Sequence, residues 1–495
     1  MGVATSRWVG AGLAAAVVVL TAAGPASAQE EVRSAPAPGV REVELTVPTA
    51  DGLALPATLR IPAGAGPGDP ALVLVHGAGP GPREKYRQEA EAYVRAGVTT
   101  LTYDKRTVGY SQTERSYSQL ADDAVAAAAV LRARPDVDPG AVGLLGLSEG
   151  GWVAPLAASR DPETAFLVVV GANGVEPLRQ QTWAEALKVE SAGVRGSLVG
   201  AASGGVYRLI NSMGMFPEPY YDPAPVLRSL TLPVLGVWGA LDRSTPPVES
   251  VAAFRAELDR ARNPHYALRT FAGAEHSLHT TVDGYSEGPD LAPGYPELVG
   301  DWTAAAAAGA APPSSVTGVG DQPRPTAVVP PSAWYESAPA HGVALGLLLA
   351  GFAGFGLVAA VRRVARAGRP GPAREPAPVA ARLVAGAGLV TVLGTLGYLA
   401  GLTMVRGGRT IDPGPLLAGR PLPWLALQVL AVVTVVAAVV LVVGLVRGRP
   451  VGAGGPGTTR APASRSGGER VRLAGLLVGA AVFVPWALYW GLLVP

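Results

Sequence analysis

The middle of the chain alternates between short apolar runs and longer segments in which apolar residues recur with helical spacing. The short runs predict β-strands and the longer segments predict helices. We expect strands at residues 41–48, 54–62, 71–77, 98–104, 141–147, 165–171, 232–239 and 265–271. We expect helices at residues 84–97 and 118–134, from about residue 151, and near residues 248–262. This alternation is typical of an α/β fold, in which a mostly parallel sheet carries helices on both faces.

Residues 172–228 interrupt the alternation. They contain the segments LRQQTWAEALKVE and MGMFPEPYYDPAP, separated by a run of small residues. Because the stretch is rich in aromatic and apolar residues, we favour an inserted helical lid; a long disordered excursion is the alternative. The strands and this insertion predict one domain over residues 29–309. The Ala- and Pro-rich composition of residues 310–341 is typical of a flexible linker.

Four apolar stretches occupy the end of the chain. They lie at residues 342–361, 383–405, 424–446 and 473–495, and none contains a charged residue. A helix needs about 20 apolar residues to cross the hydrocarbon core of a bilayer. We therefore predict a four-helix transmembrane region over residues 342–495, with membrane lipid as its partner.

The loops between these stretches differ in arginine content. Six arginines follow the first stretch, three follow the second and six follow the third. Because short loops rich in Arg and Lys stay in the cytoplasm, the first and third loops are predicted to be cytoplasmic. Residues 29–341 are then expected outside the cytoplasm, and the protein is expected to be a multi-pass protein of the cell membrane.

The N-terminus has the three parts of an export signal. Arg7 supplies the positive flank, residues 8–23 the apolar core, and Ala-Ser-Ala at 26–28 the cleavage motif. We predict a signal peptide over residues 1–28, and an uncleaved N-terminal anchor is the alternative. Both agree with the orientation that the arginines indicate.

Composition excludes several classes of chemistry. The chain has no cysteine, which excludes disulfides, thiolate catalysis and thiolate metal sites. A net charge of +2 gives no indication of a nucleic-acid partner. No His and carboxylate cluster has metal-ligand spacing, and the glycines at 79 and 81 lack the Lys and Ser/Thr of a phosphate loop. We expect no metal and no cofactor.

Ser148 is the candidate nucleophile. The segment AVGLLGLSEGGWVAP (141–155) runs from an apolar strand through Gly-x-Ser-x-Gly into a helix. That context favours a serine held on a sharp strand-to-helix turn, where glycines relieve crowding. A chance Ser in a glycine-rich turn is the alternative. A serine hydroxyl is a poor nucleophile without a base, and the base needs a carboxylate that orients it.

Candidates for the carboxylate and the base come later in the chain, each just after a predicted strand. Asp242 lies in GALDRSTPP and His276 in AGAEHSL. The order Ser, Asp, His matches a known arrangement of the triad. Asp242 is alternatively a turn residue. His279 competes with His276, which we favour because it comes first after its strand.

A reaction at Ser148 also needs donors for the oxyanion. We expect the backbone N–H groups of Glu149 and Ala78 to supply them, and His76 to brace the turn that carries Ala78. Asp104 and Arg106 are expected to form a structural ion pair near the nucleophile.

Five blocks of the sequence resemble a known protein family. The blocks are LVHGAGPGPRE, TYDKRTVGYS, GLSEGGWVAPLAA, VWGALDRSTPP and FAGAEHSL. Together they resemble α/β-hydrolases of the serine aminopeptidase and dienelactone-hydrolase-like branch, over about residues 41–309. The resemblance implies a serine hydrolase whose triad falls on Ser148, Asp242 and His276. Thr107 replaces a glycine common in this branch, and Tyr110 replaces a residue that is often charged.

These observations predict a membrane-anchored extracytoplasmic serine hydrolase that cleaves carboxylic ester or amide bonds of small molecules through an acyl-enzyme. A serine aminopeptidase-type peptidase is the first alternative, and a catalytically silent binding or sensing module of the same fold is the second. A transporter is disfavoured because the apolar stretches hold little polar chemistry beyond Gln428. No nucleic-acid partner is expected.

Overall fold

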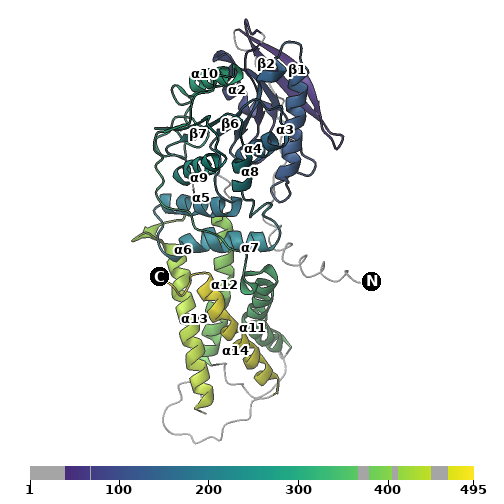
Figure 1. The fold of residues 1–495 in the computed structure, drawn as a ribbon. Coiled ribbons are helices and arrows are strands. Elements are labelled where there is room, and N and C mark those ends of the chain that lie inside the picture. Colours follow the sequence, from purple (N-terminus) through teal and green to yellow (C-terminus); the bar gives the residue numbers. More distant parts are fainter. Residues whose placement is uncertain (1–38, 67, 366–377, 404–410, 448–466) are drawn as a thin grey trace, which may run out of the picture. The chain divides into compact units, whose positions relative to one another are not determined.

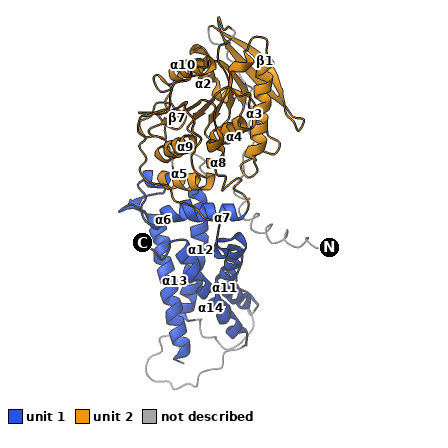
Figure 2. Ribbon diagram, in the orientation of Figure 1, with its two compact units in different colours: residues 1–26, 188–213, 331–495 blue, residues 27–187, 214–330 orange. Residues whose placement is uncertain are grey.

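The computed structural model describes residues 39–66, 68–365, 378–403, 411–447 and 467–495. They form two compact units (Figure 2). The first, here called the sheet unit, holds the described residues up to 187 and residues 214–330. The second, here called the helix unit, holds residues 188–213 and the described residues from 331 onward. The predicted signal peptide at 1–28 lies outside the described residues, as do parts of all three loops between the apolar stretches.

The sheet unit contains a nine-stranded sheet in the order β1-β2-β4-β3-β5-β6-β7-β8-β9. Figure 1 labels β1, β2, β6 and β7 of this sheet. β1 and β2 form an antiparallel hairpin, β2 also pairs antiparallel with β4, and all other neighbours are parallel. The strands are β1 (Val40–Pro48), β2 (Ala54–Pro62), β3 (Ala71–Val75), β4 (Thr99–Tyr103), β5 (Val142–Leu147), β6 (Leu167–Val170), β7 (Val234–Gly239), β8 (Tyr266–Phe271) and β9 (Ser315–Thr317). All eight predicted strands are confirmed.

The ninth strand was not expected. β9 lies inside the predicted linker at 310–341 and pairs in parallel with β8. Its residues are too few to show a strand pattern. The first part of that segment therefore extends the sheet.

Helices cover both faces of the sheet, as predicted. The apolar side chains of α3, α4, α8 and α9 pack in one core, and those of α2 and α10 pack in the core on the other face. Their bounds are α2 (Arg87–Arg95), α3 (Tyr117–Arg132), α4 (Gly150–Arg160), α8 (Ala224–Ser229), α9 (Pro247–Arg260) and α10 (Tyr295–Ala307), with the short helices η1 (Arg83–Tyr86) and η2 (Pro139–Ala141).

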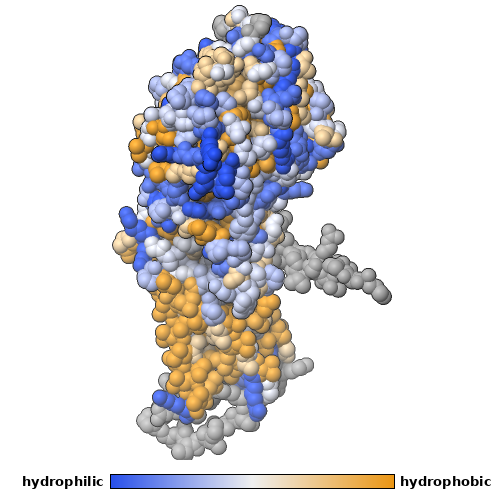
Figure 3. Space-filling view, in the orientation of Figure 1, coloured by the Kyte–Doolittle hydropathy of each residue, from blue (hydrophilic) through white to orange (hydrophobic). Residues whose placement is uncertain are grey.

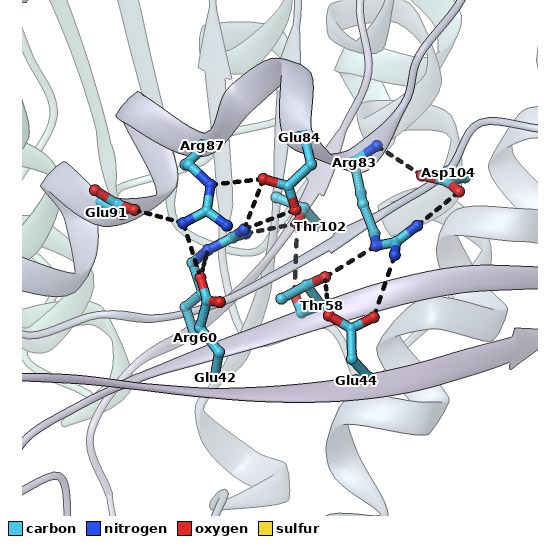
Figure 4. A network of polar contacts seen from close by, with 10 residues as sticks. All are labelled: Glu42, Glu44, Thr58, Arg60, Arg83, Glu84, Arg87, Glu91, Thr102 and Asp104. Atoms are coloured by element: carbon cyan, nitrogen blue, oxygen red, sulfur yellow. Dashed lines mark hydrogen bonds and ion pairs between the residues drawn. The ribbon is translucent and has the colours of Figure 1, made fainter. Parts of the chain in front are cut away.

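A buried arginine ties the hairpin to the rest of the sheet unit (Figure 4). The Arg60 side chain is fully buried in β2 and donates to Glu42 at 2.8 Å, Thr102 at 2.9 Å and Glu84 at 3.1 Å. Such a group is tolerated in a core because its donors are matched by carboxylates and a hydroxyl.

The predicted ion pair between Asp104 and Arg106 is wrong. Asp104 pairs with Arg83 at 2.8 Å (Figure 4), whereas Arg106 pairs with Asp51 at 2.8 Å and with Asp123 at 2.6 Å. Asp51 lies in the turn between β1 and β2, and Asp123 lies on α3. The Arg106 guanidinium therefore binds two carboxylates that are distant in sequence. The prediction had chosen Asp104 because it lies close to Arg106 in the chain.

The helix unit contains four helices that are long and apolar enough to cross a membrane. They are α11 (Ala338–Val364), α12 (Val379–Thr403), α13 (Leu422–Val446) and α14 (Gly467–Tyr489), one at each predicted apolar stretch. α14 ends before the predicted stretch does, since residues 490–495 are not helical. α11 packs mainly against α14, and α12 mainly against α13. Hydrophobic side chains dominate the visible surface of these helices (Figure 3). A two-stranded hairpin of β10 (Leu416–Leu417) and β11 (Arg420–Pro421) precedes α13.

The insertion at 172–228 is helical, and its middle part belongs to the helix unit. It contains α5 (Pro177–Ser191), α6 (Ser197–Gly200), η3 (Ala201–Gly205, a π-helical turn), α7 (Val206–Ser212) and α8. Apolar residues of the 188–213 segment share one core with the four long helices. Part of the insertion is therefore built onto the C-terminal helices, and its role as a lid stays a prediction.

Candidate active site

Ser148 lies on a tight turn between β5 and α4. Its φ angle is 54°, in the left-handed region that residues other than glycine seldom occupy. Strand and helix approach so closely that a Cβ atom on Gly146 would lie 2.1 Å from the backbone oxygen of Gly150. The N–H of Ser148 donates to the backbone oxygen of Val170 in β6 at 2.9 Å. The predicted strand–turn–helix geometry is confirmed.

Asp242 and His276 face each other. His276 Nδ1 lies 2.8 Å from Asp242 Oδ2, and the Asp242 side chain is fully buried. The other oxygen, Oδ1, accepts hydrogen bonds from the N–H groups of Ser244 and Thr245, both at 2.8 Å. Asp242 is thus both the turn residue and the partner of a histidine, which the sequence presented as alternatives.

His279 occupies a different environment. It is buried, and its Nδ1 lies 3.6 Å from Glu287 and 3.9 Å from Glu275. Of the two histidines that competed in the sequence, His276 is the one paired with Asp242.

The carboxyl end of β6 brings the candidate residues to one edge of the sheet. Val170, which holds the backbone of Ser148, is followed by Gly171. A Cβ atom on Gly171 would lie 2.6 Å from the backbone oxygen of His276 and 2.9 Å from its Nδ1. Parallel strands β5, β7 and β8 end at this same edge, so Ser148, Asp242 and His276 follow the ends of neighbouring or nearby strands.

The loop after β3 lies beside the nucleophile. A Cβ atom on Gly77 would lie 3.2 Å from Cβ of Ser148. The N–H of Gly77 donates to the hydroxyl of Tyr86 at 3.0 Å, and the N–H of Gly79 donates to the hydroxyl of Tyr110 at 2.9 Å. Ala78 lies between these two anchored residues and is exposed.

His76 supports this loop from inside. Its Nε2 lies 2.6 Å from the backbone oxygen of Tyr103, and burial, together with the charge of Lys105, lowers the pKa of His76 to about 3. A neutral imidazole therefore donates this hydrogen bond at physiological pH. The contact agrees with the bracing role expected for His76.

The side chain of Glu149 is buried beside the nucleophile, which sequence reasoning missed. Its Oε1 accepts hydrogen bonds from Lys105 Nζ at 2.8 Å and from the hydroxyl of Tyr110 at 2.9 Å, and its Oε2 accepts one from Arg115. The available signal was a lone carboxylate in an otherwise apolar segment, because a buried carboxylate requires cations nearby. Tyr110, the unusual residue of its block, is part of this group.

Burial and neighbouring charges have opposite effects on the pKa values of Glu149 and Lys105. Burial raises the pKa of Glu149, but the charges of Lys105 and Arg115 and the hydrogen bonds to the carboxylate outweigh it, so the pKa is below its ordinary value. Burial lowers the pKa of Lys105 to about 8, although Glu149 partly offsets this effect. Glu149 is therefore ionised at neutral pH, and Lys105 loses its proton in the mildly alkaline range.

No cluster of three or more His, Asp or Glu side chains in the described parts of the chain is arranged to hold a metal ion. The arrangement at this edge of the sheet instead consists of a strained serine, an imidazole–carboxylate pair and backbone donors. These are the groups that acyl transfer requires.

Known proteins with sequence similarity to this chain include hydrolases. A sequence model of the prolyl oligopeptidase family matches residues 112–287. The chain is 26% identical over 212 residues to the esterase EstD of Thermotoga maritima, covering 38% of this chain and 50% of that protein. It is 32% identical over 126 residues to the thiohydrolase aneE of Aspergillus aculeatus, covering 25% of this chain and 39% of that protein. It thus spans half or less of these relatives' lengths.

Among solved structures, the dienelactone hydrolase of Anabaena variabilis is similar with a TM-score of 0.33 at 19% identity, covering 54% of this chain and 96% of that one. The family match and the esterase relative agree with a mostly parallel sheet flanked by helices. The chain has the α/β-hydrolase fold, followed by four helices that are long and apolar enough to cross a membrane.

Proposed function

We propose that the protein is a membrane-anchored, extracytoplasmic serine hydrolase that cleaves carboxylic esters through an acyl-enzyme. The observation that carries the proposal is the 2.8 Å contact between His276 Nδ1 and Asp242 Oδ2, at the sheet edge where Ser148 occupies a strained turn. A carboxylate at Nδ1 fixes the tautomer in which Nε2 carries the lone pair that can accept a proton.

In the acylation step, one proton moves from Ser148 to His276 and one moves from His276 to the departing alcohol. Ser148 Oγ forms a bond to the carbonyl carbon while His276 takes the hydroxyl proton. The resulting oxyanion accepts hydrogen bonds from the N–H groups of Ala78 and Glu149. When the bond to the alcohol oxygen breaks, His276 returns the proton to the departing alcohol. A water molecule then repeats the sequence on the acyl-enzyme and releases the acid and free Ser148.

The oxyanion roles are supported by the hydrogen bonds around each residue. The N–H groups on either side of Ala78 are occupied by Tyr86 and Tyr110, and Ala78 itself is exposed. Within the described residues, no backbone or side-chain acceptor receives the N–H of Ala78 or of Glu149. Both donors are thus free to bind a substrate oxygen.

Peptide hydrolysis is the second candidate, favoured by the match to the prolyl oligopeptidase family. We place it second because the carboxylate next to the nucleophile is already committed. Glu149 is buried and bonded to Lys105 and Arg115, so it offers no anchor for the ammonium group of a peptide. Rates on short acyl p-nitrophenyl esters and aminoacyl p-nitroanilides compare the two directly, and faster anilide cleavage would reverse the order.

A fluorophosphonate probe tests the nucleophile. The full-length protein is expected to be labelled, and the Ser148→Ala variant is expected to lose both labelling and ester turnover. Ser111→Ala, a change at an exposed serine, is the matched control and is expected to keep both. Equal labelling of wild type and Ser148→Ala would refute the proposal.

The proposed orientation is tested by cysteine labelling, since the chain has no cysteine of its own. Val282 is 95% exposed, so Val282→Cys presents a single thiol on the sheet unit. A membrane-impermeant maleimide added to intact cells is expected to label Val282→Cys and not Ser464→Cys, which lies in the third of the three loops, one of the two that are rich in arginine. The reverse pattern would place the sheet unit in the cytoplasm.

A further inference from the structure

Lys105 and Tyr110 contact Glu149 and the loop of Ala78 at the same time. Lys105 Nζ, which donates to Glu149, also donates to the backbone oxygen of Gly77 at 2.5 Å. The Tyr110 hydroxyl, which donates to Glu149, also accepts the N–H of Gly79 at 2.9 Å. The two peptide groups that flank Ala78 are therefore both held by side chains that meet at Glu149 Oε1.

This arrangement joins two parts of the chain that are far apart in sequence. The Ala78 N–H lies on the loop after β3, whereas the Glu149 N–H lies on the turn after β5. Glu149 supplies one of these backbone donors and its own side chain holds the loop that carries the other. Lys105, whose side chain is 4% exposed, forms the direct link.

We propose that Lys105, Tyr110 and Glu149 act as a brace that sets the separation of the Ala78 and Glu149 N–H groups. The three side chains are positioning residues, since they hold the donors and do not themselves contact substrate. The inference rests on the proposed function, in which those two N–H groups receive the oxyanion. Oxyanion donors act only within about 2.7–3.1 Å of the developing charge, so a small shift of the loop removes most of their effect.

The alternative is that Lys105 merely compensates the buried charge of Glu149. Arg115 separates the two explanations, because its guanidinium bonds Glu149 Oε2 and the backbone oxygen of Gln112 but neither Gly77 nor Gly79. Removing either cation deprives Glu149 of one partner. Only the removal of Lys105 also breaks a hydrogen bond to the loop, at the backbone oxygen of Gly77.

The test compares Lys105→Met with Arg115→Met in the full-length protein. We expect Lys105→Met to lower kcat on p-nitrophenyl butyrate by about 100-fold, as loss of one oxyanion donor does, with little change in KM. The inhibition constant of a trifluoromethyl ketone, which forms an anionic tetrahedral adduct, should rise by the same factor. Arg115→Met should change each quantity by less than about one tenth of that factor. Equal effects of the two variants would overturn the brace.

Two milder variants keep the proposal testable if Lys105→Met does not fold. Tyr110→Phe removes a single oxygen and is expected to lower kcat and weaken ketone binding together, by about tenfold, with KM unchanged. Lys105→Arg keeps a cation and should recover part of the activity that Lys105→Met loses. Wild-type rates from Tyr110→Phe would overturn the brace.

Failure of the brace is distinguishable from failure of the proposed function. Every rate is taken as the difference from Ser148→Ala. If wild type shows no turnover that depends on Ser148, the proposed function fails. If that turnover is present and Lys105→Met retains it, the proposed function stands and the brace is wrong.

Discussion

Gly171, the residue after β6, contacts the imidazole of His276 at a position where no side chain fits. Its φ angle is 56°, and an added Cβ would lie 2.9 Å from Nδ1 of His276 and 2.6 Å from its backbone oxygen. Positive φ and the absence of space both require glycine here. The end of β6 thus fixes the position of the histidine as well as the backbone of Ser148.

Gly171→Ala is therefore expected to displace His276 and to strain the backbone. We predict a loss of ester turnover of at least tenfold and a lower melting temperature, because the left-handed region alone costs an alanine about 1–2 kcal/mol. Steady-state kinetics and thermal melts of the purified protein measure both. Gly273→Ala is the control, since Gly273 also has positive φ but no atoms near an added Cβ. Similar losses of turnover in both variants would contradict the prediction.

Asp242→Asn tests the orientation of the histidine. An asparagine can still accept the N–H groups of Ser244 and Thr245 through its oxygen, which preserves the turn. Its amide then donates toward His276 Nδ1 and favours the wrong tautomer. We expect kcat to fall by about 10³–10⁴-fold with the melting temperature little changed.

His279→Gln is the matched control for the histidine that the sequence left open. Because His279 lies near Glu275 and Glu287 and Asp242 pairs with His276, turnover is expected to persist. Loss of turnover in His279→Gln with its retention in His276→Gln would exchange their assigned roles.

From the position of Lys105 we predict that activity declines at alkaline pH. Burial lowers its pKa to about 8, so its ammonium is lost above that pH and the charge-assisted bonds to Gly77 and Glu149 weaken. The titratable and charged groups around it are Glu149, Arg115, Tyr110, Lys85 and His76. We expect kcat/KM to fall between pH 8 and 9.5 in wild type and to stay level in Lys105→Arg, whose guanidinium keeps its proton.

As pH rises, the contribution of Lys105 to the free energy of unfolding increases while kcat/KM is expected to fall. This difference separates the loss of activity from unfolding. The folded pKa of Lys105 is below its ordinary value of 10.5, so the unfolded chain binds more protons between pH 8 and 10.5. Through this group alone, the free energy of unfolding rises with pH across that window. A melting temperature that fell in step with kcat/KM would contradict a positioning effect.

Much of the fold was predictable because the apolar runs are periodic and uninterrupted. Every strand up to residue 271 was found from its own residues, and so were the four apolar helices. Ser148 and the Asp242–His276 pair were also predictable, since each follows a strand in an order that parallel topology converts into proximity. His76 was expected to brace the loop after β3, and its hydrogen bond to the backbone of Tyr103 agrees with that role.

The remaining contacts depend on tertiary structure that no local pattern encodes. Arg106 binds Asp51 and Asp123, and Lys105 binds Glu149, across separations of 17 to 55 residues. β9 was missed because its three residues owe their strand geometry to β8. The segment at 188–213 looked like part of a lid because sequence adjacency does not reveal that its apolar side belongs to the core of the C-terminal helices.

The buried Arg60 makes a stability prediction that is independent of catalysis. Arg60→Leu removes one hydrogen bond from Thr102 and one cation from each of Glu42 and Glu84, although Arg87 still binds both carboxylates. We expect a loss of about 1–3 kcal/mol in the free energy of unfolding, as for the loss of hydrogen bonds to charged groups. Thermal melts measure the loss, and the pH profile of ester turnover should keep its wild-type shape. Arg41→Leu, which removes an exposed ion pair with Asp136, should cost less than about 1 kcal/mol.

From the hydrogen bonds of Gln428 we predict that the four C-terminal helices hold the 188–213 segment in place and do not serve only as an anchor. From α13 its amide donates to Ser197 Oγ at 3.2 Å and to the backbone oxygens of Gly491 at 3.3 Å and Val494 at 2.9 Å. Gln428→Leu leaves these acceptors without that donor within an apolar helix unit, so the 188–213 segment should become more accessible to protease. Limited proteolysis in lipid nanodiscs measures the cleavage rate, with Val429→Leu on the exposed side of α13 as the control. Equal cleavage rates for the two variants would mean that the insertion is held without this contact.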